Sequence, residues 1–385
     1  MAKLTKLNAL LIMLAVSFAS HANNELQALG LKIDGIASGM ISPGGPGCSV
    51  GVIQNRQFLF KKSYGMANVE HSVKLTSTSK HRMASVSKQF TAFAVLLLAD
   101  DGSIALSDDI RKYLPGLHEY QHTVTINAML GHFAGMGDYD TLKALLSEPL
   151  LSSTGNAFRL GDEDYLSNDE YYEMLKSLPL LIAPEQEQRY SNFAYNILTL
   201  LVERVSGMSF RTFTQKRIFD PLGMHDTFFA DDKREVIRNR AYGYRVDEKN
   251  SRPEVFMTNL YITGDGGLFT TLDDMLLWDN HFSDPKLGKD PEGLVNLMNT
   301  PNGDFPDTEE GKWYYANGQY TDGRFFFHNG GWLGTSTSYI RRPDTKTSVV
   351  AMCNSSSLDA NALSYPMFQI LSDSGLWEGE DASVY

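Results

Sequence analysis

The chain has 385 residues and a formal net charge of −12, and its 42% hydrophobic and 21% charged residues are ordinary for a globular protein. This length favours one large domain or two intimately packed subdomains. A protein with this net negative charge has no overall positive potential to attract phosphate groups, which argues against nucleic acid and anionic membrane surfaces as partners.

The first 22 residues have the pattern of a secretory signal peptide. A basic start at Lys3 and Lys6 precedes an apolar run from Leu7 to Ala19, and small residues suit cleavage after Ala22. The apolar run is too short for a comfortable membrane span, and an uncleaved anchor is the alternative. We expect an exported protein, periplasmic or secreted, with no stable membrane anchor after cleavage.

Residues 48–68 predict a β-hairpin, because a β-branched run is followed by a turn at Gln54-Asn55-Arg56 and then by aromatic alternation. Farther on, the run QFTAFAVLLLAD predicts a long helix that ends at Gly102. From about residue 108 to 250 the pattern is mostly helical, most clearly in the helix that ends at Gly207.

The last third of the chain begins with a capping box at Thr271 to Asp274, which opens a further helix. Strands are expected from about 312 to 355, with a turn at Pro343-Asp344 between the last two. A closing helix that contains Pro366 and an acidic tail at 376–385 follow.

Strands at both ends of the chain therefore flank a mostly helical middle. The economical arrangement is an α+β fold, in which strands from about 45–70 and 312–355 form one antiparallel sheet flanked by helices. An all-helical subdomain is inserted at about 108–250. One domain is expected over residues 27–375.

The two cysteines, Cys48 and Cys353, can form a disulfide in an oxidising compartment or remain two buried free thiols. Their separation in the sequence does not decide between these alternatives. Two cysteines without clustered histidines argue against a zinc site, and we expect neither metal nor cofactor.

Three Ser-x-x-Lys tetrads begin at Ser77, Ser85 and Ser283. This tetrad is a nucleophile motif, but it fixes only two residues, so its context must separate the three. Only Ser85 is followed at once by a long apolar helix, so it is expected in the first turn of that helix, whose free N–H groups and positive end suit a developing oxyanion. Ser77 lies in a polar stretch, and the tetrad at Ser283 contains a proline and is expected in a loop.

Two further motifs supply partners for Ser85. Lys88 follows it by three residues on the same helix face, where burial and positive neighbours lower the pKa of a lysine toward that of a usable base. Tyr190 and Asn192 precede another helix, and their phenol and amide can move the nucleophile's proton and hold a substrate carbonyl. His328 ends a strand and is followed by Gly331, whose amide can act as an oxyanion donor opposite that of Ser85.

The order Ser-x-x-Lys, Tyr-x-Asn, His-x-Gly resembles the serine β-lactamase-like hydrolases of the class C and DD-peptidase type. These penicillin-recognising serine enzymes include carboxylesterases and D-amino-acid peptidases. The resemblance covers about residues 30–372 and implies a β-lactamase/transpeptidase-like fold, with the site between the sheet and the helical subdomain.

The resemblance also implies roles for single residues. Ser85 is expected to be the acylated nucleophile, with Lys88 and Tyr190 sharing the transfer of its proton. The backbone amides of Ser85 and Gly331 are expected to form the oxyanion hole. Three positions from the same motifs are expected to bind substrate: Asn192, His328 and Gly330.

The expected reaction is attack on an ester or amide carbonyl, followed by hydrolysis of the acyl-enzyme. Relatives specialised for β-lactams often carry lysine at the position of His328, so we expect an esterase or a D-amino-acid peptidase of the DD-carboxypeptidase type. The substrate would be a small or peptidoglycan-derived acyl compound. A class C-like β-lactamase is one alternative, and a non-catalytic penicillin-binding sensor is the alternative from another class.

Overall fold

The computed structural model describes residues 26–139, 168–247, 249–258, 261–303 and 312–373. The expected signal peptide and acidic tail lie outside these residues. Within the described residues, we find no helix whose length and apolar character would allow it to cross a membrane.

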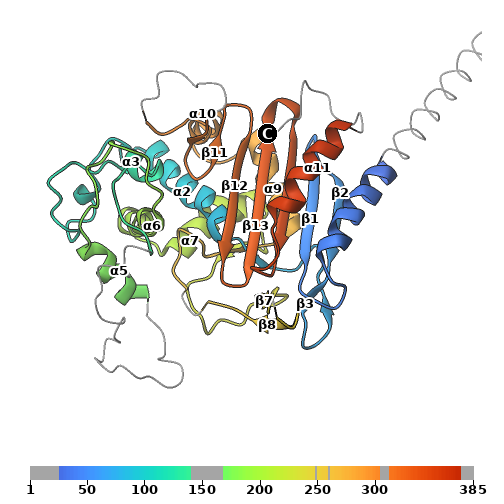
Figure 1. Cartoon of the computed structure of the whole chain (residues 1–385). Coiled ribbons are helices and arrows are strands. Elements are labelled where there is room, and N and C mark those ends of the chain that lie inside the picture. Colours follow the sequence, from blue (N-terminus) through green and yellow to red (C-terminus); the bar gives the residue numbers. More distant parts are fainter. Residues whose placement is uncertain (1–25, 140–167, 248, 259–260, 304–311, 374–385) are drawn as a thin grey trace, which may run out of the picture.

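A seven-stranded antiparallel sheet combines strands from both ends of the chain (Figure 1). Its strand order is β10-β11-β12-β13-β14-β1-β2, so the N-terminal β1 pairs with the C-terminal β14. The sheet predicted from the two ends of the sequence, and with it the α+β fold, is confirmed. The strands are β1 (Cys48–Gln54), β2 (Gln57–Tyr64), β10 (Tyr314–Tyr315), β11 (Tyr320–Thr321), β12 (Phe326–Trp332), β13 (Thr335–Arg342) and β14 (Thr347–Cys353).

The β1–β2 hairpin turns at the predicted residues. Asn55 and Arg56 have φ angles of 48° and 70°, the left-handed geometry that matches a two-residue turn to the right-handed twist of the strands. The turn before β14 also lies where it was expected, in a short 3-10 turn, Pro343–Thr345.

Helices cover both faces of the sheet (Figure 1). On one face, a helix at residues 26–40 and α11 (Asn361–Asp373) pack with the β1 side chains Val50 and Val52. On the other face, α9 (Leu272–Ser283) contacts β1 and β14. Successive strand residues point to opposite faces, so the two sides of β1 belong to two different hydrophobic clusters.

Cys48 and Cys353 lie directly opposite each other in the β1–β14 register, where a disulfide joins them. Both are completely buried. The structure therefore has the paired form, one of the two alternatives that the sequence left open.

The helical part of the molecule packs on α2 (Lys88–Asp100), which lies in the larger core. Its longest described helix, α6 (Asn192–Ser206), ends at Gly207 with φ 69°, as predicted. The other helices beyond α2 are α3 (Ile126–Leu130), α5 (Asn168–Ser177), α7 (Phe210–Thr214), α8 (Asp220–Leu222) and α10 (Pro291–Met298).

Three small sheets complete the described fold. One of them includes β5 (His81–Arg82) and β9 (Leu268–Thr270), and these strands hold the segment that leads into α2. The remaining short strands are β3 (Met66–Asn68), β4 (Val73–Lys74), β6 (Phe228–Phe229), β7 (Tyr244–Val246) and β8 (Pro253–Val255).

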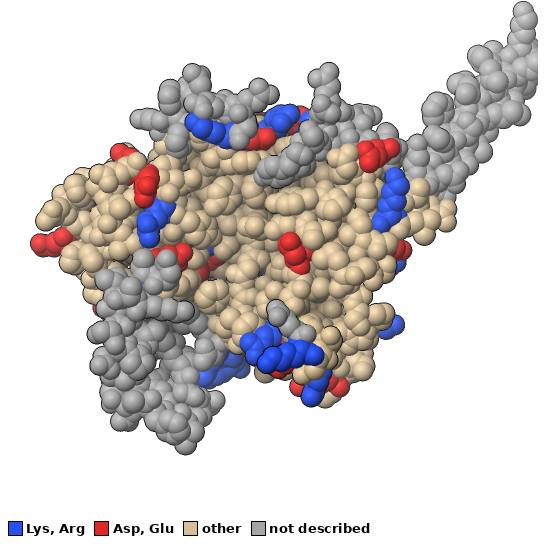
Figure 2. All heavy atoms as spheres, viewed as in Figure 1, with Lys and Arg blue, Asp and Glu red and all other residues tan. Residues whose placement is uncertain are grey.

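Figure 2 shows the same view with all atoms as spheres. Acidic and basic side chains lie mostly around the edges of this face, and among the described residues neither sign gathers over the central sheet. Basic side chains lie close together along the lower edge of this face, and the other charges are scattered (Figure 2).

Candidate active site

Ser85 lies in a 3-10 turn, η1 (Ala84–Ser87), which leads directly into α2. The residue before it, Ala84, has φ 45°, a left-handed conformation that L-residues with a side chain rarely adopt and that is often found at functional sites. The sequence correctly predicted a long helix next to Ser85. It placed Ser85 in the first α-helical turn, whereas the structure places it in the 3-10 turn just before.

Strand β12 lies against this turn at Gly330. A Cβ atom there would be 2.5 Å from the main-chain oxygen of Met83 and 3.0 Å from the nitrogen of Ser85. Only glycine allows the strand to approach the nucleophile's backbone this closely. Because β11 pairs with β12 only at Phe326 and Phe327, the following part of that edge lies next to η1 rather than in a strand pair.

Lys88 is completely buried at the first position of α2. Its Nζ donates to Ser85 Oγ at 3.1 Å, to Asn192 Oδ1 at 2.7 Å and to the main-chain oxygen of Asp265 at 2.9 Å. Three acceptors match the three hydrogens of an ammonium group. Burial lowers the pKa of Lys88 to about 8, although Asp265 and Asp138 favour its charged form. A usable fraction of the amine is therefore neutral near neutral pH.

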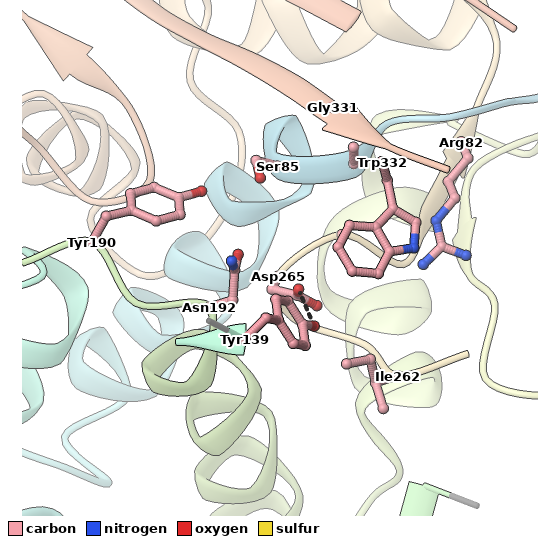
Figure 3. Close-up of a pocket in the computed structure, with 11 residues that line it drawn as sticks. Arg82, Ser85, Tyr139, Tyr190, Asn192, Ile262, Asp265, Gly331 and Trp332 are labelled. Atoms are coloured by element: carbon pink, nitrogen blue, oxygen red, sulfur yellow. Dashed lines mark hydrogen bonds between the residues drawn. The ribbon is translucent and has the colours of Figure 1, made fainter. Parts of the chain in front are cut away.

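Tyr190 immediately precedes the capping residue of α6, and its hydroxyl points toward Ser85 (Figure 3). Its ring centroid lies 4.9 Å from Lys88 Nζ. Burial raises the pKa of Tyr190 well above its usual value of 10. The group is therefore a phenol in the resting protein, and it can pass a proton between neighbours.

Asn192 connects Lys88 to a carboxylate that the sequence did not single out, Asp138. The Asn192 Nδ2 donates to the two Asp138 oxygens at 2.9 and 3.0 Å, so its Oδ1 is turned to Lys88. Ser191, which caps α6, also donates to the main-chain oxygen of Gly137 at 2.7 Å. These contacts fix the segment that carries Asp138 to the start of α6.

His328 lies in β12, with its ring centroid 6.2 Å from that of Tyr190. It is buried, and its Nε2 shares a hydrogen bond of 3.1 Å with the Tyr315 hydroxyl. Burial lowers the pKa of His328 to about 3, so the ring is neutral. Neither His328 nor Gly330 lines the cavity at Ser85, whereas Gly331 does.

A cavity of about 220 Å³ opens beside Ser85 (Figure 3). Tyr190, Asn192 and Gly331 line it together with residues that the sequence reasoning missed: Arg82, Tyr139, Ile262, Asp265 and Trp332. The sequence signal nearest to these residues is the glycine-rich stretch 264–267, where backbone can approach a ligand closely. The volume suits a small substrate group.

A model of the family described as Beta-lactamase matches residues 34–371. The chain belongs to the Beta-lactamase family. It is 30% identical over 312 residues to Penicillin-binding protein 4* of Bacillus subtilis (strain 168), covering 77% of this chain and 65% of that protein. It is 26% identical over 321 residues to Protein flp of Staphylococcus aureus (strain MRSA252), covering 80% of this chain and 59% of that protein. The chain therefore spans less than two thirds of the length of these relatives.

Solved structures of other proteins share the fold. The octameric penicillin-binding protein homologue from Pyrococcus abyssi superimposes with a TM-score of 0.74 at 22% identity, covering 91% of this chain and 77% of that one. EstCE1, described as a hydrolase with promiscuous acyltransferase activity, gives a TM-score of 0.67 at 19% identity, covering 92% and 98%. The resemblance drawn from the motifs is confirmed for family and fold, and the roles of single residues stay predictions.

Proposed function

We propose that this chain is an exported serine hydrolase that cleaves esters or amides through an acyl-enzyme. The observation that carries the proposal is the Lys88–Ser85 pair, a buried lysine with a pKa of about 8 whose Nζ is 3.1 Å from a serine oxygen at a cavity. A nucleophile, a nearby base and a cavity for the reacting group are the minimum that acyl transfer needs.

In this mechanism the neutral amine of Lys88 accepts the proton of Ser85 while Oγ attacks the carbonyl carbon. The backbone amides of Ser85 and Gly331 stabilise the negative oxygen of the tetrahedral intermediate. Collapse of this intermediate releases the alcohol or amine, which takes a proton through Tyr190. Water, which loses a proton to Lys88, then attacks the carbonyl carbon of the acyl-enzyme. The bond to Ser85 Oγ breaks, the oxygen regains its proton, and the acid product leaves.

Lys88 rather than Tyr190 is the base in this proposal. Deprotonating Lys88 near neutral pH costs little because its pKa is about 8, whereas the pKa of the Tyr190 phenol is raised well above 10. Tyr190 then relays protons between Ser85, Lys88 and the leaving group. Asn192 holds Lys88 in place and contributes to substrate binding.

The substrate that we propose is a small ester or a D-amino-acid peptide, including peptides derived from peptidoglycan. The neutral His328 supplies no fixed positive charge to a substrate carboxylate, which favours an esterase or peptidase over a class C-like β-lactamase. Export to the periplasm or beyond rests on the signal-peptide pattern, and the Cys48–Cys353 disulfide supports an oxidising compartment.

A labelling experiment tests the nucleophile. Intact-mass measurement after treatment with a fluorophosphonate should find one adduct, absent from Ser85→Ala and retained in Ser77→Ala, which alters the other nearby tetrad. An adduct that survives Ser85→Ala overturns the assignment.

Turnover separates the hydrolase from the non-catalytic sensor. A panel of p-nitrophenyl esters, a chromogenic cephalosporin, a D-Ala-D-Ala peptide and D-amino-acid amides should include at least one that wild type, but not Ser85→Ala, hydrolyses repeatedly. A stable penicillin adduct on Ser85 with no turnover of any panel member would instead favour the sensor.

A further inference from the structure

Asp265 has a buried carboxylate that faces the cavity at Ser85. Its side chain and main chain together are 8% exposed, and it lies in the glycine-rich loop 264–267. Its main-chain oxygen accepts from Lys88 Nζ, while its carboxylate lines the cavity beside Tyr139 (Figure 3). The Tyr139 hydroxyl donates to Asp265 Oδ2 at 2.8 Å.

The nearby cations do not bind this carboxylate. Lys88 directs its hydrogens to Ser85, Asn192 and the main-chain oxygen of Asp265. Burial raises the pKa of Asp265, while Lys88 and Arg82 both favour its ionised form from a distance. No hydrogen bond joins either cation to the carboxylate, although Arg82 lines the same cavity. Within the described chain, the Tyr139 hydroxyl is the one side-chain donor to this carboxylate. Burial of the carboxylate is compensated only in part by one hydrogen bond and two cations that do not contact it, so an ammonium group in direct contact would lower its free energy further.

The position of Asp265 relative to the nucleophile restricts what that cation can be. Lys88 Nζ lies 2.9 Å from the Asp265 main-chain oxygen and 3.1 Å from Ser85 Oγ, so the loop and the nucleophile are immediate neighbours. In an α-amino acyl compound the nitrogen is separated from the carbonyl carbon by one carbon atom. Because Ser85 and Asp265 both line one cavity of about 220 Å³, a single small substrate group can place its carbonyl at Ser85 and its ammonium at the Asp265 carboxylate.

We propose that Asp265 binds the α-ammonium group of the substrate, so that the preferred substrates are esters or amides of α-amino acids whose amino group is free. This inference rests on the proposed function, since it concerns the acyl part of the bond that Ser85 attacks. The aromatic side chains of Tyr139 and Trp332 line the same cavity and favour a cation there. Arg82 lies beyond the Trp332 indole in Figure 3, away from Tyr139.

The test compares D-alanine methyl ester with methyl propionate, which has the same carbon skeleton but no amino group. L-alanine methyl ester is included to determine which enantiomer the protein prefers. At about pH 6.5, below the usual pKa of an α-amino group, wild type should show a kcat/KM about ten- to a hundredfold higher for the better alanine ester than for methyl propionate, which is the range of charged hydrogen bonds. Asp265→Asn should bring this ratio close to one. The ratio cancels any effect of the substitution on Lys88 that is common to both esters.

Asp273→Asn is the matched control, because it removes an exposed carboxylate on α9 that pairs with Lys61 on the protein surface. It should leave the ratio unchanged. Equal kcat/KM values of wild type for methyl propionate and the alanine esters would overturn the inference and leave the proposed function standing. An unchanged ratio in Asp265→Asn would do the same. Wild type that turns over none of the panel compounds contradicts the proposed function instead.

A binding measurement on wild type needs neither turnover nor a folded variant. Alaninamide and propionamide are added in increasing concentration before the fluorophosphonate, and the rate of Ser85 labelling is followed by intact mass. Alaninamide should protect at about ten- to a hundredfold lower concentration than propionamide. Equal protection by the two amides overturns the role of Asp265.

Discussion

Lys88 combines two properties that usually exclude each other, complete burial and an ionisable ammonium. Each of its three hydrogens has an acceptor, so the charged form is tolerated. Burial nevertheless lowers its pKa to about 8. The buried position that holds the amine against Ser85 therefore also brings its pKa near neutral pH, where part of the amine is unprotonated and can accept a proton.

The rate should follow the ionisation of Lys88. Below about pH 8 the neutral fraction of a base rises with pH, so kcat/KM should increase about tenfold per pH unit and level off above about pH 8. His328, with a pKa of about 3, should add no step between pH 5 and 7. A pH–rate profile on a neutral ester checks this, and a rate that falls as pH rises toward 8 would contradict it. Lys88→Arg, which cannot lose its proton, should be inactive.

Asp138 influences Ser85 through Asn192 and Lys88. It fixes the Asn192 amide and favours the charged form of Lys88. In Asp138→Asn the pKa of Lys88 should decrease, which moves the midpoint of the pH–rate profile below 8, and kcat should fall about tenfold or more because Asn192 is free to turn. The profile of the variant is the measurement. A lower kcat with an unmoved midpoint would indicate that Asp138 has only a structural role.

At the scale of elements, the nucleophile depends on how closely β12 approaches η1. Gly330 allows this approach, since a Cβ there would be 2.4 Å from Thr337 Oγ1 and 2.5 Å from the Met83 main-chain oxygen. The strand and the turn come from segments far apart in the chain. Their contact, rather than either segment alone, sets the position of Ser85 relative to Gly331.

Gly330→Ala should therefore reduce both stability and activity. Overpacking a close contact costs about 1–3 kcal/mol, and displacement of β12 should lower kcat/KM at least about tenfold through loss of alignment. Gly116→Ala is the control, because a Cβ at Gly116 meets no atom within 4 Å. Thermal unfolding and kcat/KM of the two variants check the prediction, and a Gly330→Ala protein with wild-type kinetics would contradict it.

Elements with local signals were predicted from the sequence. Thr271 caps α9 by accepting from the Asp274 nitrogen, Gly207 ends α6, and Asn55 and Arg56 form the β1–β2 turn. Such signals act between residues that are neighbours in the chain, so a sequence displays them directly.

The cavity walls carried no comparable signal. Tyr139 and Asp265 line the cavity, and Asp138 lies next to Tyr139 in the chain. A lone aspartate or tyrosine outside a long element has no periodicity that indicates its neighbours. The left-handed Ala84 was also missed, because glycine or asparagine usually marks such a position. Tertiary packing places all of these residues, and the three motifs located only the part of the site that they contain.

At the scale of the whole molecule, the sheet joins the beginning of the described chain to its end. β1 and β14 pair along their whole length, and the disulfide between Cys48 and Cys353 crosses this pair with a sequence separation of 305. A cross-link that closes so long a loop restricts the unfolded chain strongly.

Removing the disulfide should reduce stability without disturbing the site. Cys48→Ala/Cys353→Ala is expected to lose about 2–4 kcal/mol of the free energy of unfolding. Both cysteines pack in the cluster that contains α11, on the other side of the sheet from α9, so kcat/KM at moderate temperature should be retained. Denaturant titration of the oxidised wild type and the double variant gives the difference, and equal unfolding free energies would contradict the prediction.

The disulfide also determines what happens when the backbone is cut. Ser85, Tyr190, Asp265 and Gly331 all lie between Cys48 and Cys353, so a protease that cleaves one exposed peptide bond in this interval leaves two fragments that are still covalently joined. The nicked protein would migrate as one species until it is reduced. A cut between Ser85 and Gly331 would divide the catalytic groups between two polypeptides, yet they would remain in a single molecule that the disulfide and the paired strands β1 and β14 hold together.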